Sequence, residues 1–116
     1  MTSTTPAVPA ELDPDAASAL VHSGGAVLID VREPHEWTAG HAPQARHLPL
    51  GQLDPRLLDD TSTYVLVCRS GRRSATGAQA LLAAGRTAYN LTGGMQAWQL
   101  AGLDVRDDAG QPGVVR

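Results

Sequence analysis

The sequence predicts an α/β fold, with a small parallel β-sheet and helices on both faces. Residues 26–29 and 64–67 are short continuous apolar runs, which are typical of strands buried on both faces. Helical patterns alternate with these runs, and that alternation favours a parallel sheet. The 116 residues are enough for one domain, and the twelve glycines and eight prolines among them indicate short elements joined by many turns.

Turn and capping residues set the other expected elements. A helix is predicted to start at Asp13-Pro14-Asp15, because these residues supply a capping side chain, a proline and an acid near the positive end of the helix. It is expected to end before Gly24-Gly25. A weak strand is predicted over 45–50, and Pro49 places it near an edge or an end. Another short strand is predicted over 88–91. Further helices are expected at 34–39, 53–59, 74–85 and about 95–101.

Composition divides the chain into a folded unit and two flanks. Residues 1–10 are mostly Thr, Ser, Pro and Ala, and we expect a loose N-terminal segment there. A single domain is predicted over 11–105. Residues 106–116 are rich in Asp, Gly and Pro and are expected to form a flexible C-terminal tail.

Charge and cysteine content exclude several classes of protein. The net charge of −3 gives no reason to expect nucleic acid or an anionic membrane as a partner. No run approaches the ~20 apolar residues of a membrane span, and the first residues lack secretory features, so we expect a cytoplasmic protein. The single cysteine rules out an internal disulfide or a multi-cysteine zinc site, and no histidine pair has metal-ligand spacing. All nine basic residues are arginines, which excludes a lysine-dependent P-loop or Schiff base.

The segment CRSGRRS, residues 68–74, carries the predicted chemistry. It leaves a buried strand and enters a helix N-terminus, where unpaired N–H groups and the helix dipole favour an anion. Gly71 permits the tight turn, and Arg69, Arg72 and Arg73 raise the positive potential. Such a setting lowers a cysteine pKa from about 8.5, so Cys68 is predicted to be a thiolate nucleophile for an anionic electrophile. A purely structural buried cysteine is the alternative.

Four segments resemble the rhodanese family in its single-domain form. They are LIDVREPHEW (28–37), GHAPQARHLPL (40–50), YVLVCRSGRRS (64–74) and LTGGMQAW (91–98), and they occur in the order found in the family. The resemblance spans about residues 10–105 and implies a rhodanese-like fold. Ala42 and Gln44 depart from the usual family residues, in a turn away from the cysteine loop.

The resemblance implies sulfur transfer. Cys68 would attack the outer sulfur of a donor such as thiosulfate, sulfite would leave, and the persulfide would pass its sulfur to cyanide or a thiol. The loop N–H groups of Arg69, Ser70, Gly71, Arg72 and Arg73 would stabilise the persulfide. Arg73, alone or together with Arg72 or Arg69, would orient the sulfonate group, and no metal or organic cofactor is required.

Three further residues are assigned supporting roles. The resemblance implies that Asp30 helps to hold the loop, and Ser74 closes the loop. Arg32 is predicted to form a structural ion pair with Glu36, four residues on, and contact with substrate is the alternative. His41 and His47 are not needed as a base, and Trp98 is expected to anchor the core.

The same residues are compatible with other functions. The domain could be a sulfur-relay module that accepts a persulfide from a partner such as a cysteine desulfurase, or an inactive interaction domain. Cysteine-dependent phosphatases and arsenate reductases space Cys and Arg by five residues. Here Ser74 occupies that position and Arg73 comes one residue earlier, so the smaller loop suits a sulfur atom better than a phosphate.

Overall fold

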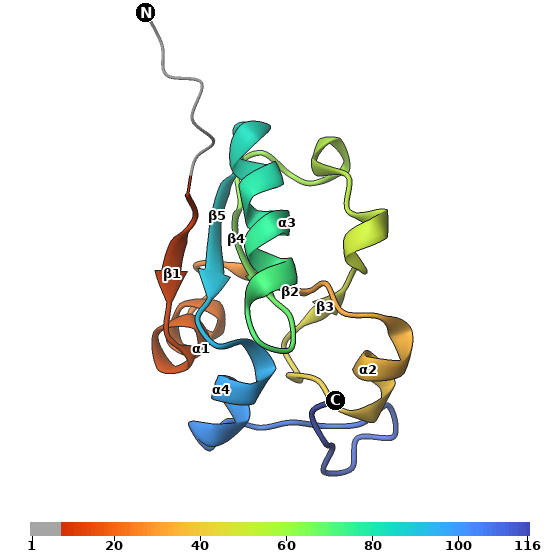
Figure 1. Cartoon of the computed structure of the whole chain (residues 1–116). Helices are drawn as coiled ribbons and strands as arrows, with labels where there is room; N and C mark the ends of the chain where they lie inside the picture. Colours follow the sequence, from red (N-terminus) through yellow and green to blue (C-terminus); the bar gives the residue numbers. More distant parts are fainter. Residues whose placement is uncertain (1–7) are drawn as a thin grey trace, which may run out of the picture.

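The computed structural model describes residues 8–116 and shows a five-stranded parallel sheet with strand order β1-β5-β4-β2-β3 (Figure 1). The predicted α/β class is confirmed. The strands are β1 (Ala10–Leu12), β2 (Val27–Asp30), β3 (Arg46–His47), β4 (Thr63–Val67) and β5 (Thr87–Leu91). The helices are α1 (Pro14–His22), α2 (Pro34–Ala39), α3 (Arg72–Ala83) and α4 (Gly94–Leu100), with 3₁₀ turns at Leu50–Gln52 and Pro55–Leu57.

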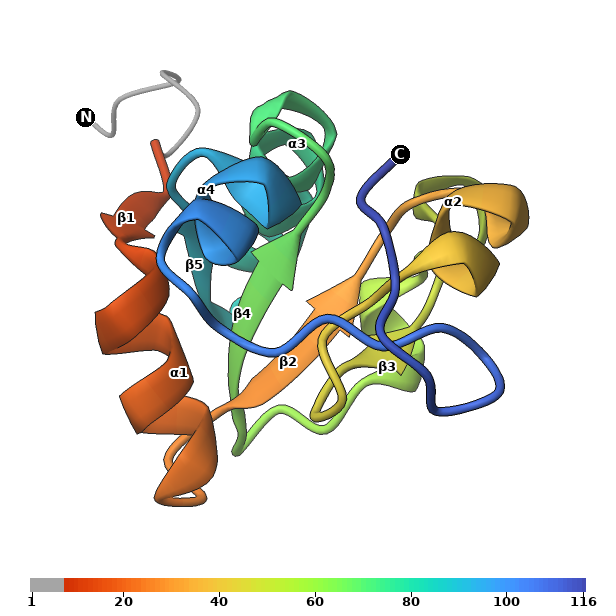
Figure 2. The ribbon, with the colours of Figure 1, turned by 90° about the horizontal axis from the view of Figure 1, so that it is seen from below.

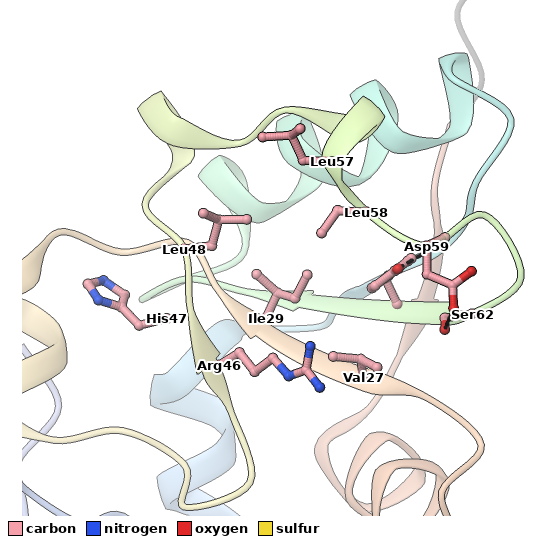
Figure 3. A pocket seen from close by; sticks show the side chains of 10 residues that line it. Val27, Ile29, Arg46, His47, Leu48, Leu57, Leu58, Asp59 and Ser62 are labelled. Atoms are coloured by element: carbon pink, nitrogen blue, oxygen red, sulfur yellow. Dashed lines mark hydrogen bonds between the residues drawn. The ribbon is translucent and has the colours of Figure 1, made fainter.

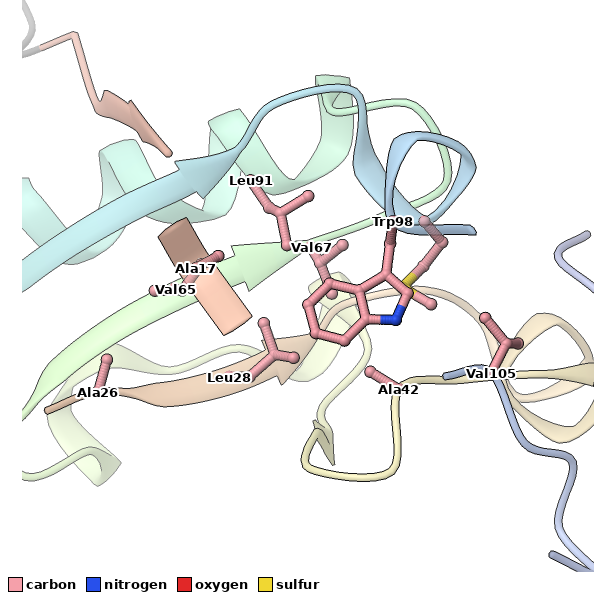
Figure 4. Packing of buried hydrophobic residues seen from close by; sticks show 10 residues of the cluster. Ala17, Ala26, Leu28, Ala42, Val65, Val67, Leu91, Trp98 and Val105 are labelled. Carbon is pink, nitrogen blue, oxygen red and sulfur yellow. The ribbon is translucent and has the colours of Figure 1, made fainter. Parts of the chain in front are cut away.

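Helices cover both faces of the sheet (Figure 2). Successive side chains of a strand point to opposite faces, and the two apolar clusters follow this alternation. Leu28 and Val65 pack in one cluster with residues of α1 and α4, including the fully buried Trp98 (Figure 4). Ile29 and Leu66 pack in the other cluster with residues of α3. Trp98 is therefore the core anchor that the sequence predicts, and its indole N–H donates to the Asp104 carbonyl at 2.9 Å.

Local sequence accounts for the ends of the first helix. The Asp13 carboxylate accepts a hydrogen bond from the Ala16 N–H at 2.8 Å, and Pro14 occupies the first turn of α1. Gly24, with φ at 81°, turns the chain towards β2. The strand predicted at 45–50 is reduced to the two residues of β3, at the edge of the sheet where Pro49 favours it.

Described residues of both flanks make backbone contacts with the domain. Ala10 lies in β1, which pairs with β5, so this residue of the predicted segment 1–10 belongs to the sheet. Residues 1–7 of that prediction lie outside the described part of the chain. Residues 106–116 follow a defined path, because Arg106 exchanges backbone hydrogen bonds with His41 and Val114 donates to Ala39. Their flexibility and the 11–105 domain limits stay predictions.

Two helix predictions are corrected at their limits. The helix expected over 53–59 is only the 3₁₀ turn Pro55–Leu57. The α3 helix begins at Arg72 rather than at Ser74, because Gly71 has φ at 108° and acts as the N-cap. Arg72 and Arg73 are therefore in the first helical turn rather than in the loop.

None of the helices in the described part of the chain has the length and apolar character needed to span a bilayer.

The N-terminus of α4 holds the loop that follows β4. The Met95 N–H donates to the Cys68 carbonyl at 2.7 Å, and the Gln96 N–H donates to the Arg69 carbonyl at 3.1 Å. Gly94 precedes both donors with φ at 62°, and a Cβ there would overlap the carbonyl of Cys68 and the backbone of Arg69. The Gly93-Gly94 pair therefore allows two backbone segments to approach each other directly.

We expect Gly94→Ala to lower the free energy of unfolding by about 2 kcal/mol or more, because it adds a backbone overlap to the cost of positive φ. Urea denaturation measures the change. Gly102→Ala is the matched control, since Gly102 also has positive φ (79°) but no atom within 4 Å of the position that a Cβ would take. Equal losses in the two variants would contradict close packing of α4 on the loop.

Candidate functional site

The Cys68 sulfur lies at the N-terminus of α3. The Gly71 N–H donates to Sγ at 3.1 Å, and the Ser74 hydroxyl oxygen lies 3.3 Å from Sγ. Gly71, the N-cap residue of α3, has no side chain that could accept hydrogen bonds from the N–H groups of the first turn. Of the predicted loop donors, the Gly71 N–H faces the sulfur in the structure, and Cys68 is only 1% exposed.

Hydrogen bonds decide the protonation of this thiol. Burial raises the pKa of Cys68, because it removes water from the charged form. The Ser74 hydroxyl and the backbone N–H groups of Ser74, Gly71 and Ser70 lower it by a larger combined amount. The net pKa of Cys68 therefore lies below the ordinary value of a thiol, which favours the nucleophilic thiolate.

A polar network continues from the sulfur into the sheet. The Ser74 hydroxyl oxygen lies 2.6 Å from Oδ1 of Asn90, a β5 side chain that is only 3% exposed. The Asn90 amide nitrogen donates to the Gly71 carbonyl at 3.0 Å and to the Glu11 carboxylate at 2.9 Å. Asn90 thus joins the loop, the start of α3 and the edge strand β1.

Arg73 is held by an ion pair with Glu36 of α2. Its two terminal nitrogens donate to the two carboxylate oxygens at 2.7 and 2.8 Å. This bidentate geometry is a strong form of charge-assisted hydrogen bond. It lowers the pKa of Glu36 from 4.5 to about 2 and raises the pKa of Arg73. The pair fastens α2 to the first turn of α3.

The predicted Arg32–Glu36 pair is wrong. Arg32 instead pairs with Asp30 at 2.7 Å, both side chains being fully buried, and also donates to the Gly40 carbonyl at 2.7 Å. The helical spacing rule does not apply, because Arg32 precedes the first residue of α2. Asp30 accepts hydrogen bonds from the backbone and side chain of Arg32, so its contacts stabilise the turn after β2.

The remaining cations of the loop lie at the surface. Arg69 and Arg72 are exposed, as is Ser70. Neither guanidinium forms an ion pair within residues 8–116, in contrast to Arg73. The structure therefore separates the three predicted arginines into one that is bound by a carboxylate and two that can meet an anion from solution.

The two histidines near α2 have other contacts. His41 Nδ1 lies 2.6 Å from the Trp37 carbonyl oxygen, and His47 Nε2 lies 2.8 Å from the Arg32 carbonyl oxygen. Both rings stack on Trp37, with centroids 3.6 and 4.8 Å away. Within the described residues neither ring hydrogen-bonds to the sulfur, whose bonded partners are Gly71 and Ser74.

A well-formed pocket lies away from this site. It has a volume of about 500 Å³ and lies among Val27, Ile29, Arg46, Leu58 and Tyr64 (Figure 3). Val27 and Tyr64 stand near the amino ends of β2 and β4, whereas Cys68 follows the carboxyl end of β4. Across residues 8–116, no three His, Cys, Asp or Glu side chains converge to hold a metal ion.

Sequence reasoning missed Asn90 and Glu11. A signal for Asn90 was available, since a polar residue in a short buried strand needs a hydrogen-bond partner. Glu11 gave no such signal, because it is exposed and its strand lacks an apolar pattern. Glu36 was recognised as an ion-pair residue but given the wrong partner.

Acid should break the Glu36–Arg73 pair. The pKa of Glu36 is lower in the folded chain, about 2 against 4.5, so the pair stabilises the fold above pH 4.5 and is lost as the pH falls towards 2. We expect the free energy of unfolding of Glu36→Gln to fall less steeply over this range than that of the wild type, measured by urea denaturation at several pH values.

Asp54→Asn is the matched control, because Asp54 also accepts two hydrogen bonds from an arginine side chain, that of Arg56, but at the surface. Arg56 also lowers the pKa of Asp54, but solvent screens a surface pair, so the slope of this variant should change less than that of Glu36→Gln. A Glu36→Gln slope equal to that of the wild type would contradict the role given to the pair.

Comparison with known proteins places this geometry in a family. The sequence model of one protein family, the rhodanese-like domain, matches residues 13–101. A rhodanese-related protein from Thermoplasma volcanium is similar in fold, with a TM-score of 0.76 and 24% identity over 83% of this chain and 96% of that chain.

Two other solved structures are more similar in sequence. A rhodanese-like domain protein from Staphylococcus aureus is 30% identical, with a TM-score of 0.70 over 77% of this chain and 90% of that chain. A thiosulfate sulfurtransferase from Pseudomonas aeruginosa is 28% identical, with a TM-score of 0.75 over 93% of this chain and 22% of that longer chain. The family model covers most of this chain, and the Cys68 sulfur lies at the start of α3. The chain therefore belongs to the family of rhodanese-like domains.

Proposed function

We propose that the protein is a sulfurtransferase that moves a sulfane sulfur from thiosulfate, or a related anionic donor, to a thiol or cyanide through a Cys68 persulfide. The observation that carries this proposal is the sulfur at the amide-lined start of α3, with the Gly71 N–H 3.1 Å from Sγ and a lowered pKa. The likeness to a thiosulfate sulfurtransferase supports the choice of donor.

The first half-reaction forms one sulfur–sulfur bond and breaks another. The Cys68 thiolate attacks the outer sulfur of thiosulfate, and the bond between the two sulfur atoms of thiosulfate breaks, so sulfite leaves with that electron pair. The product is a Cys68 persulfide that keeps the single negative charge of the thiolate. The N–H groups around the sulfur stabilise that anion, in the way that an oxyanion hole stabilises an alkoxide.

The second half-reaction restores the enzyme. Cyanide or a thiolate attacks the outer persulfide sulfur, and the bond to Sγ breaks, so Cys68 leaves as a thiolate. With cyanide the product is thiocyanate, and the charges balance. Each half-reaction needs only a nucleophile and a leaving group, so no metal, organic cofactor or external oxidant takes part in the proposed cycle.

The arginines have different tasks in this proposal. Arg73 is paired with Glu36, so it positions the first turn of α3. Arg69 and Arg72 are exposed and attract the sulfonate end of the donor. The same two side chains fit an acidic surface, so a protein that delivers persulfide is the second candidate donor, and Cys68 would then act in a sulfur relay.

We expect Cys68→Ser to lower sulfite release from thiosulfate, in the presence of cyanide, by more than about a thousandfold, because the nucleophile is lost. Intact-mass measurement after thiosulfate incubation should show a gain of one sulfur atom in the wild type, removed by cyanide, and no gain in Cys68→Ser. Equal sulfite release by the two proteins would end the proposal. Slow release together with rapid sulfur uptake from a cysteine desulfurase would favour the relay.

We expect Arg69→Gln and Arg72→Gln to raise KM for thiosulfate by about two- to tenfold with little change in kcat, because an exposed cation that binds the donor equally in the ground and transition states affects binding alone. Initial-rate kinetics measure both constants. Arg46→Gln is the matched control, since Arg46 is an exposed arginine beside the cavity at the amino ends of the strands. An unchanged KM in both loop variants would exclude them from donor binding.

A further inference from the structure

Asn90 has a fixed side-chain orientation. Its amide nitrogen lies 2.9 Å from a Glu11 carboxylate oxygen and 3.0 Å from the Gly71 carbonyl oxygen. Both neighbours of the nitrogen only accept hydrogen bonds, so they take the two N–H donors of the amide. The amide oxygen must therefore point the other way, towards Ser74.

The Ser74 hydroxyl therefore has one hydrogen, and two neighbouring atoms can accept it. Its hydroxyl oxygen lies 2.6 Å from Oδ1 of Asn90 and 3.3 Å from Sγ of Cys68. The Asn90 oxygen cannot donate, so the short contact requires the Ser74 hydrogen. While the hydrogen lies there, Ser74 presents a lone pair to the sulfur. That arrangement suits a thiol, which can donate its own hydrogen, and opposes a thiolate or persulfide anion.

We propose that Asn90 is a positioning residue that acts on the nucleophile through Ser74, by accepting the hydroxyl hydrogen while Cys68 is a thiol and releasing it to the sulfur while the sulfur is anionic. This inference rests on the proposed function, which requires the anionic sulfur. The hydroxyl turns about its C–O bond. The S–H bond of Cys68 is the only covalent bond that breaks, and its proton passes to solvent water or hydroxide. The cost of forming the anion includes the hydrogen bond that Asn90 gives up.

Glu11 completes the arrangement from outside the family match. It lies on β1, before the matched residues 13–101, and its second carboxylate oxygen accepts from the Thr92 hydroxyl at 3.2 Å. The carboxylate is therefore held between two donors on or next to β5, and it keeps the Asn90 N–H groups away from Ser74. An edge strand is thereby linked to the sulfur through three side chains.

Charged groups surround the same sulfur and must be held constant in a test. Arg73 comes from α3, and Glu36 faces it from α2. Asp30 and Arg32 lie at the end of β2 as a buried pair, and Glu11 lies on β1 behind Asn90. None of these side chains is changed in the variants below. Asn90→Ala also removes the contacts with Gly71 and Glu11, so only the difference between its effects with and without the Ser74 hydroxyl reports the hydroxyl.

The test is a double-mutant cycle of Ser74→Ala and Asn90→Ala, read from thiolate absorbance as the pH is raised. Cys68 is the sole cysteine, and Cys68→Ser supplies the blank. With Ser74 in place, Asn90→Ala should raise the ratio of thiolate to thiol at a fixed pH by about fivefold, the change that corresponds to one net hydrogen bond of about 1 kcal/mol. In the Ser74→Ala background it should not raise the ratio.

The same change in both backgrounds, or a decrease in both, would overturn the inference, because Asn90 would then act only by anchoring the loop through Gly71. Circular dichroism checks that each variant folds. If Asn90→Ala does not fold, Asn90→Val replaces it, since valine favours a strand and also lacks the acceptor. Sulfite release by the wild type is measured separately. If Asn90 and Ser74 are coupled in the thiolate ratio but no sulfur is transferred, the proposed function is rejected. If sulfur is transferred but the two residues are not coupled, only the role of Asn90 is rejected.

Discussion

The hydrogen bonds between the start of α3 and the Cys68 sulfur are the interaction on which the site depends. A thiol that is 1% exposed would ordinarily keep its proton, because burial penalises the charged form. The N–H groups of Gly71, Ser70 and Ser74 replace the lost water with donors that are already oriented. Preorganised donors of this kind stabilise a charge without the reorganisation that water needs, so the same burial that would suppress a thiolate also excludes competing solvent.

Such donors work only if the loop is rigid, and three elements hold it. The first residues of α4 bind the carbonyls of Cys68 and Arg69, which leaves the loop amides free to face the sulfur. The α2 helix holds the first turn of α3 through Glu36 and Arg73. Asn90 of β5 holds the Gly71 carbonyl. Because these contacts come from separate parts of the chain, the loop conformation is set by the whole fold rather than by its own sequence.

This explains how much could be predicted from the sequence. Buried strands, glycine positions and the cysteine at a strand end are encoded locally, so the α/β class, the start of α1 and the placement of Cys68 at the start of a helix were predictable. Side-chain partners depend on register and on turns between elements. Arg32 was expected to reach forwards along a helix, but the turn before α2 directs it back to Asp30. Asn90 meets Ser74 only because β5 and α3 pack together.

The segments that flank the matched region also contact the residues that hold the site. Glu11, ahead of residue 13, fixes the Asn90 amide, and residues beyond 101 return to α2. There Val114 donates to the Ala39 carbonyl, next to Gly40, whose own carbonyl accepts from the buried Arg32. A side chain at Gly40 would overlap the Val114 backbone, so this contact depends on a glycine. The segments on either side of the family match therefore support the turn after β2 and the turn after β4, where the charged residues of the site are concentrated. A domain cut at the limits of the match would lose both of these supports.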